Sequence, residues 1–112
     1  MDCIFCKIAC GDIPSEKLYE DDSIIAFRDL DPQAPVHILF IPKAHITSVS
    51  EITEENGAVV GHIFASAAKL AKELGLDNGY RIVTNCGDDG GQSVGHLHFH
   101  LLGGRALGWP PG

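Results

Sequence analysis

Three histidines alternate with apolar residues near the end of the 112-residue chain, at positions 96, 98 and 100. In a β-strand successive side chains point to opposite faces, so this spacing places three imidazoles on one face and apolar side chains on the other. Such a row can hold a metal ion, or it can supply a nucleophile and acid–base groups for work on phosphate. Three unrelated surface histidines are the alternative. A purification tag is excluded by the interleaved apolar residues and the internal position.

The residues that precede these histidines favour phosphate over metal. Glycines at positions 87, 90, 91 and 95 allow the backbone to turn tightly and to approach a ligand closely. Gln92, Ser93 and successive backbone N–H groups can donate hydrogen bonds to an oxyanion. Glycine-rich turns are more often ordinary hairpin loops, so it is their adjacency to the histidines that predicts a phosphate site.

A second group with chemical potential is the pair Cys3-x-x-Cys6. The chain has four cysteines and no secretory signal, which favours reduced thiols or metal ligation over a disulfide framework. A redox dithiol and two unremarkable thiols are the other interpretations of the pair. We expect Cys10 and Cys86 to be small buried hydrophobic residues, and His62 to be solvated on the polar side of a helix.

Composition restricts the class of protein. A hydrophobic content of 45% in 112 residues predicts one compact domain over residues 1–112. A secretory signal and an apolar run long enough to cross a membrane are both lacking, so we expect a soluble cytoplasmic protein with no membrane partner. A formal net charge of −7 argues against polymeric nucleic acid but leaves a small phosphorylated ligand possible.

The elements that must position these residues can be read from periodicity and turn signals. Apolar spacing predicts a short helix after Asp2, which would be its N-cap, and one long amphipathic helix from about residue 53 to residue 74. A proline- and glycine-rich tail covers residues 103–112. The pattern indicates an α+β fold on an antiparallel sheet. Strands are expected at residues 17–20, 23–29, 36–41, 80–85 and 96–102.

The sequence His96-Leu-His-Phe-His-Leu-Leu resembles the motif of the histidine-triad nucleotide-binding proteins, and several flanking segments resemble their Hint branch. The resemblance runs from residue 4 to residue 112. It implies a five-stranded antiparallel sheet with one long helix and a short N-terminal helix. It also implies a homodimer with a continuous sheet, in which the tail reaches toward the partner. The flanking segments are Phe27-Arg-Asp-Leu-Asp-Pro-Gln-Ala-Pro, Ile41-Pro-Lys-Ala-His45-Ile, Gly90-Gly-Gln-Ser-Val, Gly103-Gly-Arg and Trp109-Pro-Pro-Gly.

The resemblance implies a hydrolase of purine nucleoside phosphoramidates that forms a nucleotidyl-histidine and needs no cofactor for catalysis. His98 matches the nucleophile, which must attack as an unprotonated imidazole. His100 and Ser93 match positions that hydrogen-bond the phosphate or the leaving group, and His96 completes the catalytic set. A dinucleoside polyphosphate hydrolase, a nucleotide-binding regulatory module and a metal-dependent hydrolase with the triad as ligands are the alternatives.

Further positions carry over as a nucleotide-binding set. Asp29 matches the carboxylate that accepts both ribose hydroxyls, although a turn residue at a strand end is an equal interpretation. His37 matches a histidine packed beside the triad, and we expect it to be structural support. The apolar members would otherwise be ordinary core. The remaining members of the set are Ile4, Phe5, Ile8, Phe27, Leu30, Leu39, Asn85, Gly91, Gln92, Val94 and Trp109.

The cysteine pair departs from the animal Hint proteins but resembles several bacterial relatives. In those relatives the pair binds zinc together with the histidine of the Pro-Lys-x-His motif and the first triad histidine. Here the ligands would be Cys3, Cys6, His45 and His96. A Cys2His2 set is typical of structural zinc and would join the N-terminal helix to the final strand.

Overall fold

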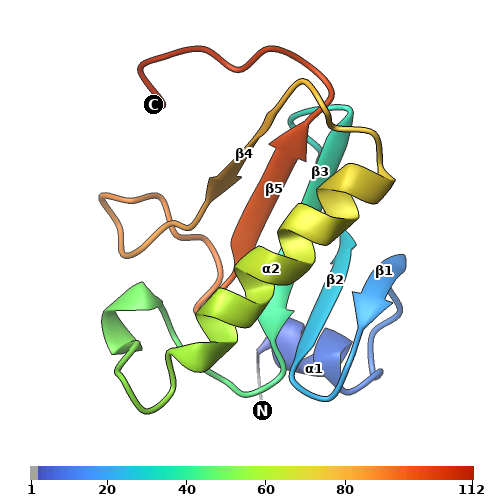
Figure 1. Ribbon diagram of the computed structural model, residues 1–112. Helices are drawn as coiled ribbons and strands as arrows, with labels where there is room; N and C mark the ends of the chain where they lie inside the picture. Colours follow the sequence, from blue (N-terminus) through green and yellow to red (C-terminus); the bar gives the residue numbers. More distant parts are fainter. Residues whose placement is uncertain (1–2) are drawn as a thin grey trace.

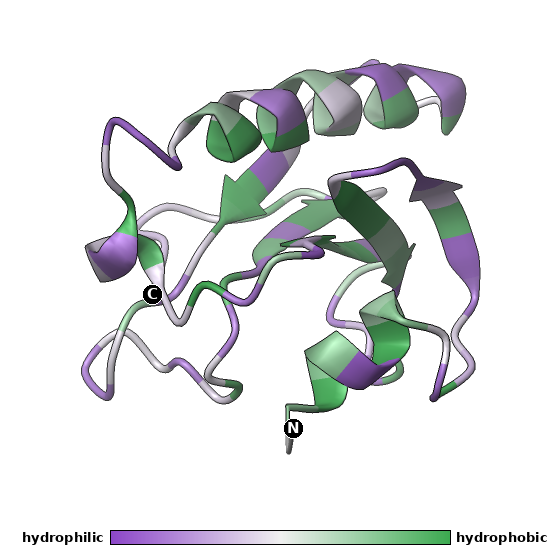
Figure 2. Ribbon diagram, turned by 90° about the horizontal axis from the view of Figure 1, so that it is seen from below, coloured by the Kyte–Doolittle hydropathy of each residue, from purple (hydrophilic) through white to green (hydrophobic). Residues whose placement is uncertain are grey.

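The structure is a computed structural model and describes residues 3–112. Its strands pair antiparallel in one sheet of order β1-β2-β3-β5-β4. The α2 helix lies across one face of this sheet and α1 lies against the other (Figures 1 and 2). The fold predicted from the sequence is confirmed. The elements are α1 Ile4–Ala9, β1 Lys17–Glu20, β2 Ile24–Arg28, β3 Val36–Pro42, α2 Ala58–Glu73, β4 Tyr80–Val83 and β5 Phe99–Gly103.

Both faces of the central strands are buried, each in its own core. Ile38 and Phe40 of β3 point toward α2, while their neighbours Leu39 and Ile41 point toward α1. This is the period-two alternation of a strand, applied to a sheet that is covered on both sides. The apolar stripe of α2 completes the larger core, and Phe5 of α1 belongs to the smaller one. Figure 2 shows the hydrophobic sides of both helices turned toward the sheet.

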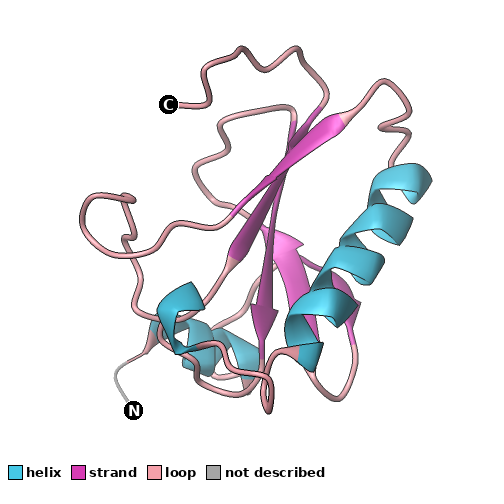
Figure 3. Ribbon diagram, turned by 60° about the vertical axis from the view of Figure 1, so that its left-hand side comes forward, coloured by secondary structure: helices cyan, strands magenta, loops and turns pink. Residues whose placement is uncertain are grey.

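The long helix begins later than its apolar periodicity suggested. Residues 54–57 form a turn, and the Thr53 N–H donates to Asn56 Oδ1 at 2.7 Å, so α2 starts at Ala58. A one-turn 3-10 helix, Val49–Glu51, lies in the loop that leads to α2 (Figure 3). At the other end Gly75 has φ +75°, a conformation that favours glycine and ends the helix. Within residues 3–112, no helix is long and apolar enough to cross a membrane.

The final strand is shorter than predicted: β5 begins at Phe99, not at His96. Its partner β3 ends at Pro42, which has no N–H to donate to a continued ladder. The chain before Phe99 turns to the segment after β3 instead, where the Leu97 N–H donates to the Ile46 carbonyl at 2.6 Å. Two of the three alternating histidines therefore precede the strand. The apolar side chains between and after them still join the α2-facing core.

The fourth strand also ends early, at Val83 instead of the expected residue 85. At the next position a side chain takes over from the backbone ladder, because Thr84 Oγ1 donates to the His98 carbonyl at 2.8 Å. This contact fastens the end of β4 to the segment that carries the histidines.

The N-terminal helix has a different cap from the one expected. Asp2 lies outside the described residues, and the N-cap position of α1 belongs to Cys3. Cys3 Sγ accepts a hydrogen bond from the Cys6 N–H at 3.3 Å. The two cysteines of the motif thus start the helix together.

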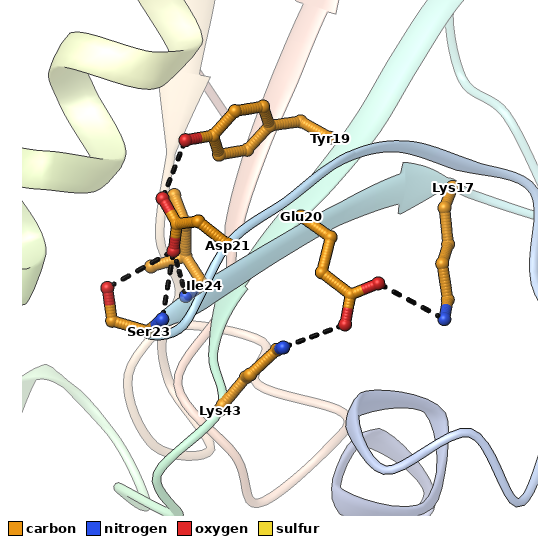
Figure 4. A network of polar contacts seen from close by, with 7 residues as sticks. All are labelled: Lys17, Tyr19, Glu20, Asp21, Ser23, Ile24 and Lys43. Atoms are coloured by element: carbon orange, nitrogen blue, oxygen red, sulfur yellow. Dashed lines mark hydrogen bonds and ion pairs between the residues drawn. The ribbon is translucent and has the colours of Figure 1, made fainter.

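A polar network joins the β1–β2 turn to its surroundings (Figure 4). Asp21 Oδ1 accepts from the backbone N–H groups of Ser23 and Ile24, and Oδ2 accepts from Tyr19 Oη at 2.6 Å. His62 of α2 contacts the same oxygen at 2.6 Å. The expectation that His62 is merely solvated was wrong, since its ring pairs α2 with this turn. These hydrogen bonds hold the pKa of Asp21 well below its usual range.

Candidate active site and metal centre

A cavity of about 280 Å³ opens on the α1 face of the sheet. Its walls are mostly apolar, with a few ionisable groups among them, as is typical of small-molecule sites. Eleven of the predicted site residues lie in its lining. The lining residues are Ile4, Phe5, Ile8, Ile13, Pro14, Ser15, Phe27, Arg28, Asp29, Leu30, Leu39, Ser93, Val94, His98 and His100.

His98 is buried at the cavity with its ring orientation fixed by the backbone. Its Nδ1 lies 2.7 Å from the carbonyl oxygen of His96. A carbonyl oxygen only accepts, so Nδ1 carries the hydrogen, and Nε2 of the neutral ring keeps its lone pair. The ring of Phe5 meets His98 edge-on with a centroid separation of 5.0 Å. This arrangement presents an unprotonated nitrogen that can attack an electrophile bound in the cavity.

The ring of His100 carries its hydrogen on the other nitrogen, Nε2, as its hydrogen-bond partners show. The Gln33 N–H donates to His37 Nδ1 at 3.0 Å, so the hydrogen of neutral His37 is on Nε2. His37 Nε2 lies 2.9 Å from His100 Nδ1 and donates to it. His100 therefore carries its own hydrogen on Nε2. Beside the acceptor nitrogen of His98 the cavity thus has a donor, and the two rings are 5.0 Å apart between centroids.

Burial keeps the rings of His100 and His37 uncharged. Desolvation, reinforced by the neighbouring His98 and His37, lowers the pKa of His100 from 6.5 to about 4. Desolvation also lowers the pKa of His37, opposed by the negative charges of Asp29 and Asp31. A neutral His100 is what the hydrogen-bond chain requires, because a second proton on Nδ1 would face the N–H of His37.

Asp29 is both a turn residue at a strand end and a carboxylate at the cavity, the two interpretations drawn from the sequence. It directly follows β2, and its Oδ1 accepts from the Asp31 N–H at 2.8 Å, as in a turn. Its Oδ2 lies 3.4 Å from His37 Nε2, and the residue lines the cavity. A short carboxylate is therefore held at the cavity by its own turn.

The glycine-rich segment contributes to the cavity through only two of the expected residues, Ser93 and Val94. Gln92 instead braces the loop, since its Nε2 donates to the carbonyls of Thr47 and Val94, and its Oε1 accepts from the Gly87 N–H. Asn85 Nδ2 donates to the Gly90 carbonyl. Within residues 3–112, Asn85, Gly91 and Gln92 therefore lie outside the cavity lining and shape the loop that presents Ser93.

Three expected binding residues are exposed. Leu30 is 99% exposed at the cavity and Ile4 is 48% exposed, so neither belongs to a closed core. Trp109 is 83% exposed and lies outside the cavity lining. An apolar side chain that is held in water beside a cavity is available to cover a ligand.

The structure also brings together the four residues predicted to bind zinc. Their ligand atoms lie within 4.8 Å of one another. Cys6 Sγ is 3.2 Å from His45 Nδ1 and 3.5 Å from His96 Nδ1, and Cys3 Sγ is 3.4 Å from His96 Nδ1. A tetrahedral zinc ion with ordinary bond lengths separates sulfur and nitrogen ligands by about 3.5 Å. Two thiols and two imidazoles at these separations fit zinc.

His96 is oriented for this centre and not for the cavity. Its ring is fully buried, and Nε2 lies 2.8 Å from the Pro42 carbonyl, so Nε2 carries the hydrogen. The lone pair of Nδ1 then points to the two cysteines, an arrangement typical of metal-binding histidines. The three alternating histidines do not form one row: His96 faces the cysteines, and His98 and His100 face the cavity.

The other two cysteines are not buried hydrophobic residues, so that prediction was wrong. Cys10 is exposed, and Cys86 is half-buried with its Sγ 3.0 Å from Ser50 Oγ. Hydrogen bonds from Ser50 and Ser48 lower the pKa of the Cys86 thiol.

Four lining residues were missed from the sequence: Ile13, Pro14, Ser15 and Arg28. Residues 13–15 were given no role in the expected binding set. Their position directly behind a helix expected to line the pocket was the available signal. Arg28 is adjacent to Asp29, and its Nε is paired with Glu16 Oε2 at 2.5 Å.

Comparison with known proteins places the chain in a family. Residues 10–107 match the model of the HIT domain. The chain belongs to the HIT domain family. A 14 kDa zinc-binding protein of Brassica juncea is 50% identical over 113 residues, covering 99% of this chain and all of that protein.

Solved structures agree with this membership. A HIT family hydrolase from Legionella pneumophila superimposes with a TM-score of 0.97 at 49% identity, covering 99% of this chain and 100% of that one. A histidine triad nucleotide-binding protein from Candida albicans has a TM-score of 0.82 at 38% identity, covering 97% of this chain and 83% of that one.

The buried imidazoles predict a pH-dependent stability. In the unfolded chain His100 takes up a proton near pH 6.5, whereas in the folded chain it does so near pH 4. Between these values the unfolded state binds more protons, so we expect the free energy of unfolding to fall as pH decreases from 6.5 to 4. One pKa unit corresponds to about 1.4 kcal/mol, which makes this contribution on the order of 3 kcal/mol.

Urea unfolding followed by circular dichroism at several pH values measures this slope. His100→Gln removes the titrating ring, and the slope of this variant should be clearly smaller between pH 4 and 6.5. Equal slopes in the two proteins would show that burial of His100 does not shift its protonation.

Proposed function

We propose that this HIT protein belongs to the Hint branch and hydrolyses purine nucleoside phosphoramidates. The observation that carries the proposal is the tautomer pair in the cavity: an acceptor nitrogen on His98 beside a donor N–H on His100. A phosphorus electrophile with anionic oxygens needs both, one group to attack and one to stabilise the charge. The relative named as a HIT family hydrolase supports a hydrolytic reaction, and the relative named as a nucleotide-binding protein supports a nucleotide as the ligand.

The reaction has two steps. His98 Nε2 forms a bond to the α-phosphorus while the phosphorus–nitrogen bond of the substrate breaks, and the leaving amine takes a proton from water. A second water then attacks phosphorus and gives a proton to the hydroxide left by the first, the bond to Nε2 breaks with its electron pair returning to the ring, and nucleoside monophosphate is released. His100 Nε2–H and Ser93 donate to the phosphate oxygens in both steps. His37 keeps the hydrogen of His100 directed to the cavity.

The apolar part of the cavity binds the purine, and Asp29 binds the ribose. Phe5, Phe27 and Leu39 are buried beneath the base, and exposed Leu30 covers it. Asp29 Oδ2 can accept hydrogen bonds from ribose hydroxyls, because Oδ1 is already engaged in its turn.

We expect His98→Ala to lower turnover of an adenosine phosphoramidate by at least about a thousandfold, because loss of a nucleophile removes the covalent path. Its affinity for AMP, measured by calorimetry, should stay within about threefold. Rapid acid quench and mass spectrometry should find a nucleotidyl adduct on His98 of the unaltered protein.

His62→Ala is the matched control, since His62 lies on α2 across the sheet and should leave turnover unchanged. Near-normal turnover in His98→Ala would refute the role of His98. A dinucleoside polyphosphate assayed in parallel should be cleaved much more slowly than the phosphoramidate, and the reverse order would favour that substrate class.

We also propose that Cys3, Cys6, His45 and His96 bind one structural zinc ion. Two deprotonated thiols and two neutral imidazoles form an ordinary ligand set for zinc, and the ion would link α1 to the segment before β5. The similarity to a protein named for zinc binding supports this assignment.

Elemental analysis of the purified protein should find about one zinc per chain, and chelation should lower its melting temperature. Cys3→Ser combined with Cys6→Ser should lose the zinc. Cys10→Ser combined with Cys86→Ser is the matched control and should keep it. Zinc retained by the first variant would place the metal elsewhere.

Finally, we propose that the single domain, residues 1–112, forms a homodimer through the free edge of β4, with the tail, residues 103–112, reaching toward the partner. The β4 strand is at the edge of the sheet order, and unpaired strand edges favour pairing with a second chain. Light scattering should give twice the 12.0 kDa chain mass. A monomer mass at micromolar concentration would contradict this assembly.

A further inference from the structure

The short helix α1 takes part in both the cavity and the cysteine–histidine cluster. Cys3 and Cys6 lie on either side of Ile4 and Phe5 in the sequence, within one helical turn. The two thiols contact His45 and His96, whereas Ile4 and Phe5 line the cavity. One turn of helix therefore has the metal-ligand set on one side and the ligand cavity on the other.

A helix of six residues is not stable by itself in water, so its position depends on tertiary contacts. Phe5 and Ile8 provide apolar packing at 7% exposure each. Within residues 3–112, the hydrogen bonds that join α1 to the chain beyond Ile13 are those of Cys3 and Cys6 with the two histidines. The polar attachment of α1 thus consists of the metal-ligand set.

The nucleophile has anchors of another kind. The His96 carbonyl that orients His98 belongs to a residue whose ring donates to the Pro42 carbonyl at 2.8 Å. The next N–H, of Leu97, donates to the Ile46 carbonyl at 2.6 Å. These contacts hold the backbone at His98 whether or not Cys3 and Cys6 are tied to the histidines. The cavity wall and the nucleophile should therefore respond differently to loss of a metal ion.

We propose that occupation of the Cys3–Cys6–His45–His96 site by a metal ion sets the nucleotide affinity of the cavity by fixing α1 as its wall. Cys3 and Cys6 are then positioning residues for the base, and the ion has no part in the chemical step. The inference rests on the proposed nucleotide binding, but it does not depend on which phosphorus bond is cleaved.

Two quantitative consequences follow from this coupling. Removal of the metal should weaken AMP binding by about tenfold, while turnover at saturating substrate falls less than about twofold. Because coupling between two binding sites is reciprocal, saturating AMP should raise the affinity for zinc by the same factor of about ten. A zinc site that only stabilised the fold as a whole would not separate KM from kcat.

The test compares zinc-loaded protein, chelator-treated protein and the double variant Cys3→Ser with Cys6→Ser. Calorimetry gives the AMP dissociation constant, and hydrogen exchange reports the protection of residues 3–9. Circular dichroism monitors the remaining fold. Cys10→Ser is the matched control, because this exposed thiol lies at the end of the same helix outside the ligand set.

The reciprocal measurement uses the unaltered protein, with zinc affinity determined by competition with a chromophoric chelator, with and without AMP. The proposal is supported by weaker AMP binding, faster exchange confined to residues 3–9 and a matching shift in zinc affinity. It is overturned if the affinity for AMP is the same with and without zinc, or if the affinity for zinc is the same with and without AMP. Unfolding of the whole domain on chelation would also overturn it. Coupled binding without phosphoramidate turnover would instead refute the proposed hydrolase and leave the coupling intact.

Discussion

The hydrogen bond from His96 Nε2 to the Pro42 carbonyl determines how the rest of the site is arranged. By placing the hydrogen on Nε2, it directs the Nδ1 lone pair to Cys3 and Cys6. It also fixes the backbone of His96, whose carbonyl then orients His98. Pro42 is well suited to this role, because a proline ends the β3 ladder and leaves its carbonyl free to face the ring. The proposed metal-ligand set and the orientation of His98 thus depend on one buried contact between the end of β3 and the segment before β5.

The imidazoles at the cavity follow the same rule: each neutral ring carries one N–H, and a hydrogen-bond partner determines which nitrogen carries it. Each imidazole there has one nitrogen engaged with a group of fixed polarity, and that partner decides which nitrogen faces the ligand. The Gln33 N–H fixes His37, and His37 fixes His100. Burial favours the neutral rings that this chain requires, so desolvation and hydrogen bonding act in the same direction.

Much of the fold could be predicted because the sequence follows simple periods. Alternation placed Leu97, Phe99 and Leu101 in the core, and the apolar stripe of α2 was visible at helical spacing. What failed were boundaries and contacts between distant segments. β5 begins only at Phe99 because its partner β3 ends at Pro42, and the pairing of His62 with Asp21 joins residues 41 positions apart. Neither event leaves a local pattern, since both depend on how separate segments meet.

The site divides in the same way. The resemblance supplied the residue types, and the geometry supplied their positions and hydrogen-bond partners. Gln92 and Asn85 form hydrogen bonds within a loop, whereas Pro14 and Ser15 line the cavity although they belong to no recognised motif. His98 and His100 differ in which ring nitrogen carries the hydrogen. A sequence motif cannot show this difference, because both positions are histidine.

The neutrality of His37 and His100 has a consequence for the kinetics of recognition. The chain has a formal net charge of −7, and uncharged rings do not offset it near the cavity. An approaching anion therefore meets a repulsive field until it is close enough for hydrogen bonds to act over a few ångströms. Selectivity for the proposed nucleotide would then depend on a slow dissociation rate and not on a fast association rate.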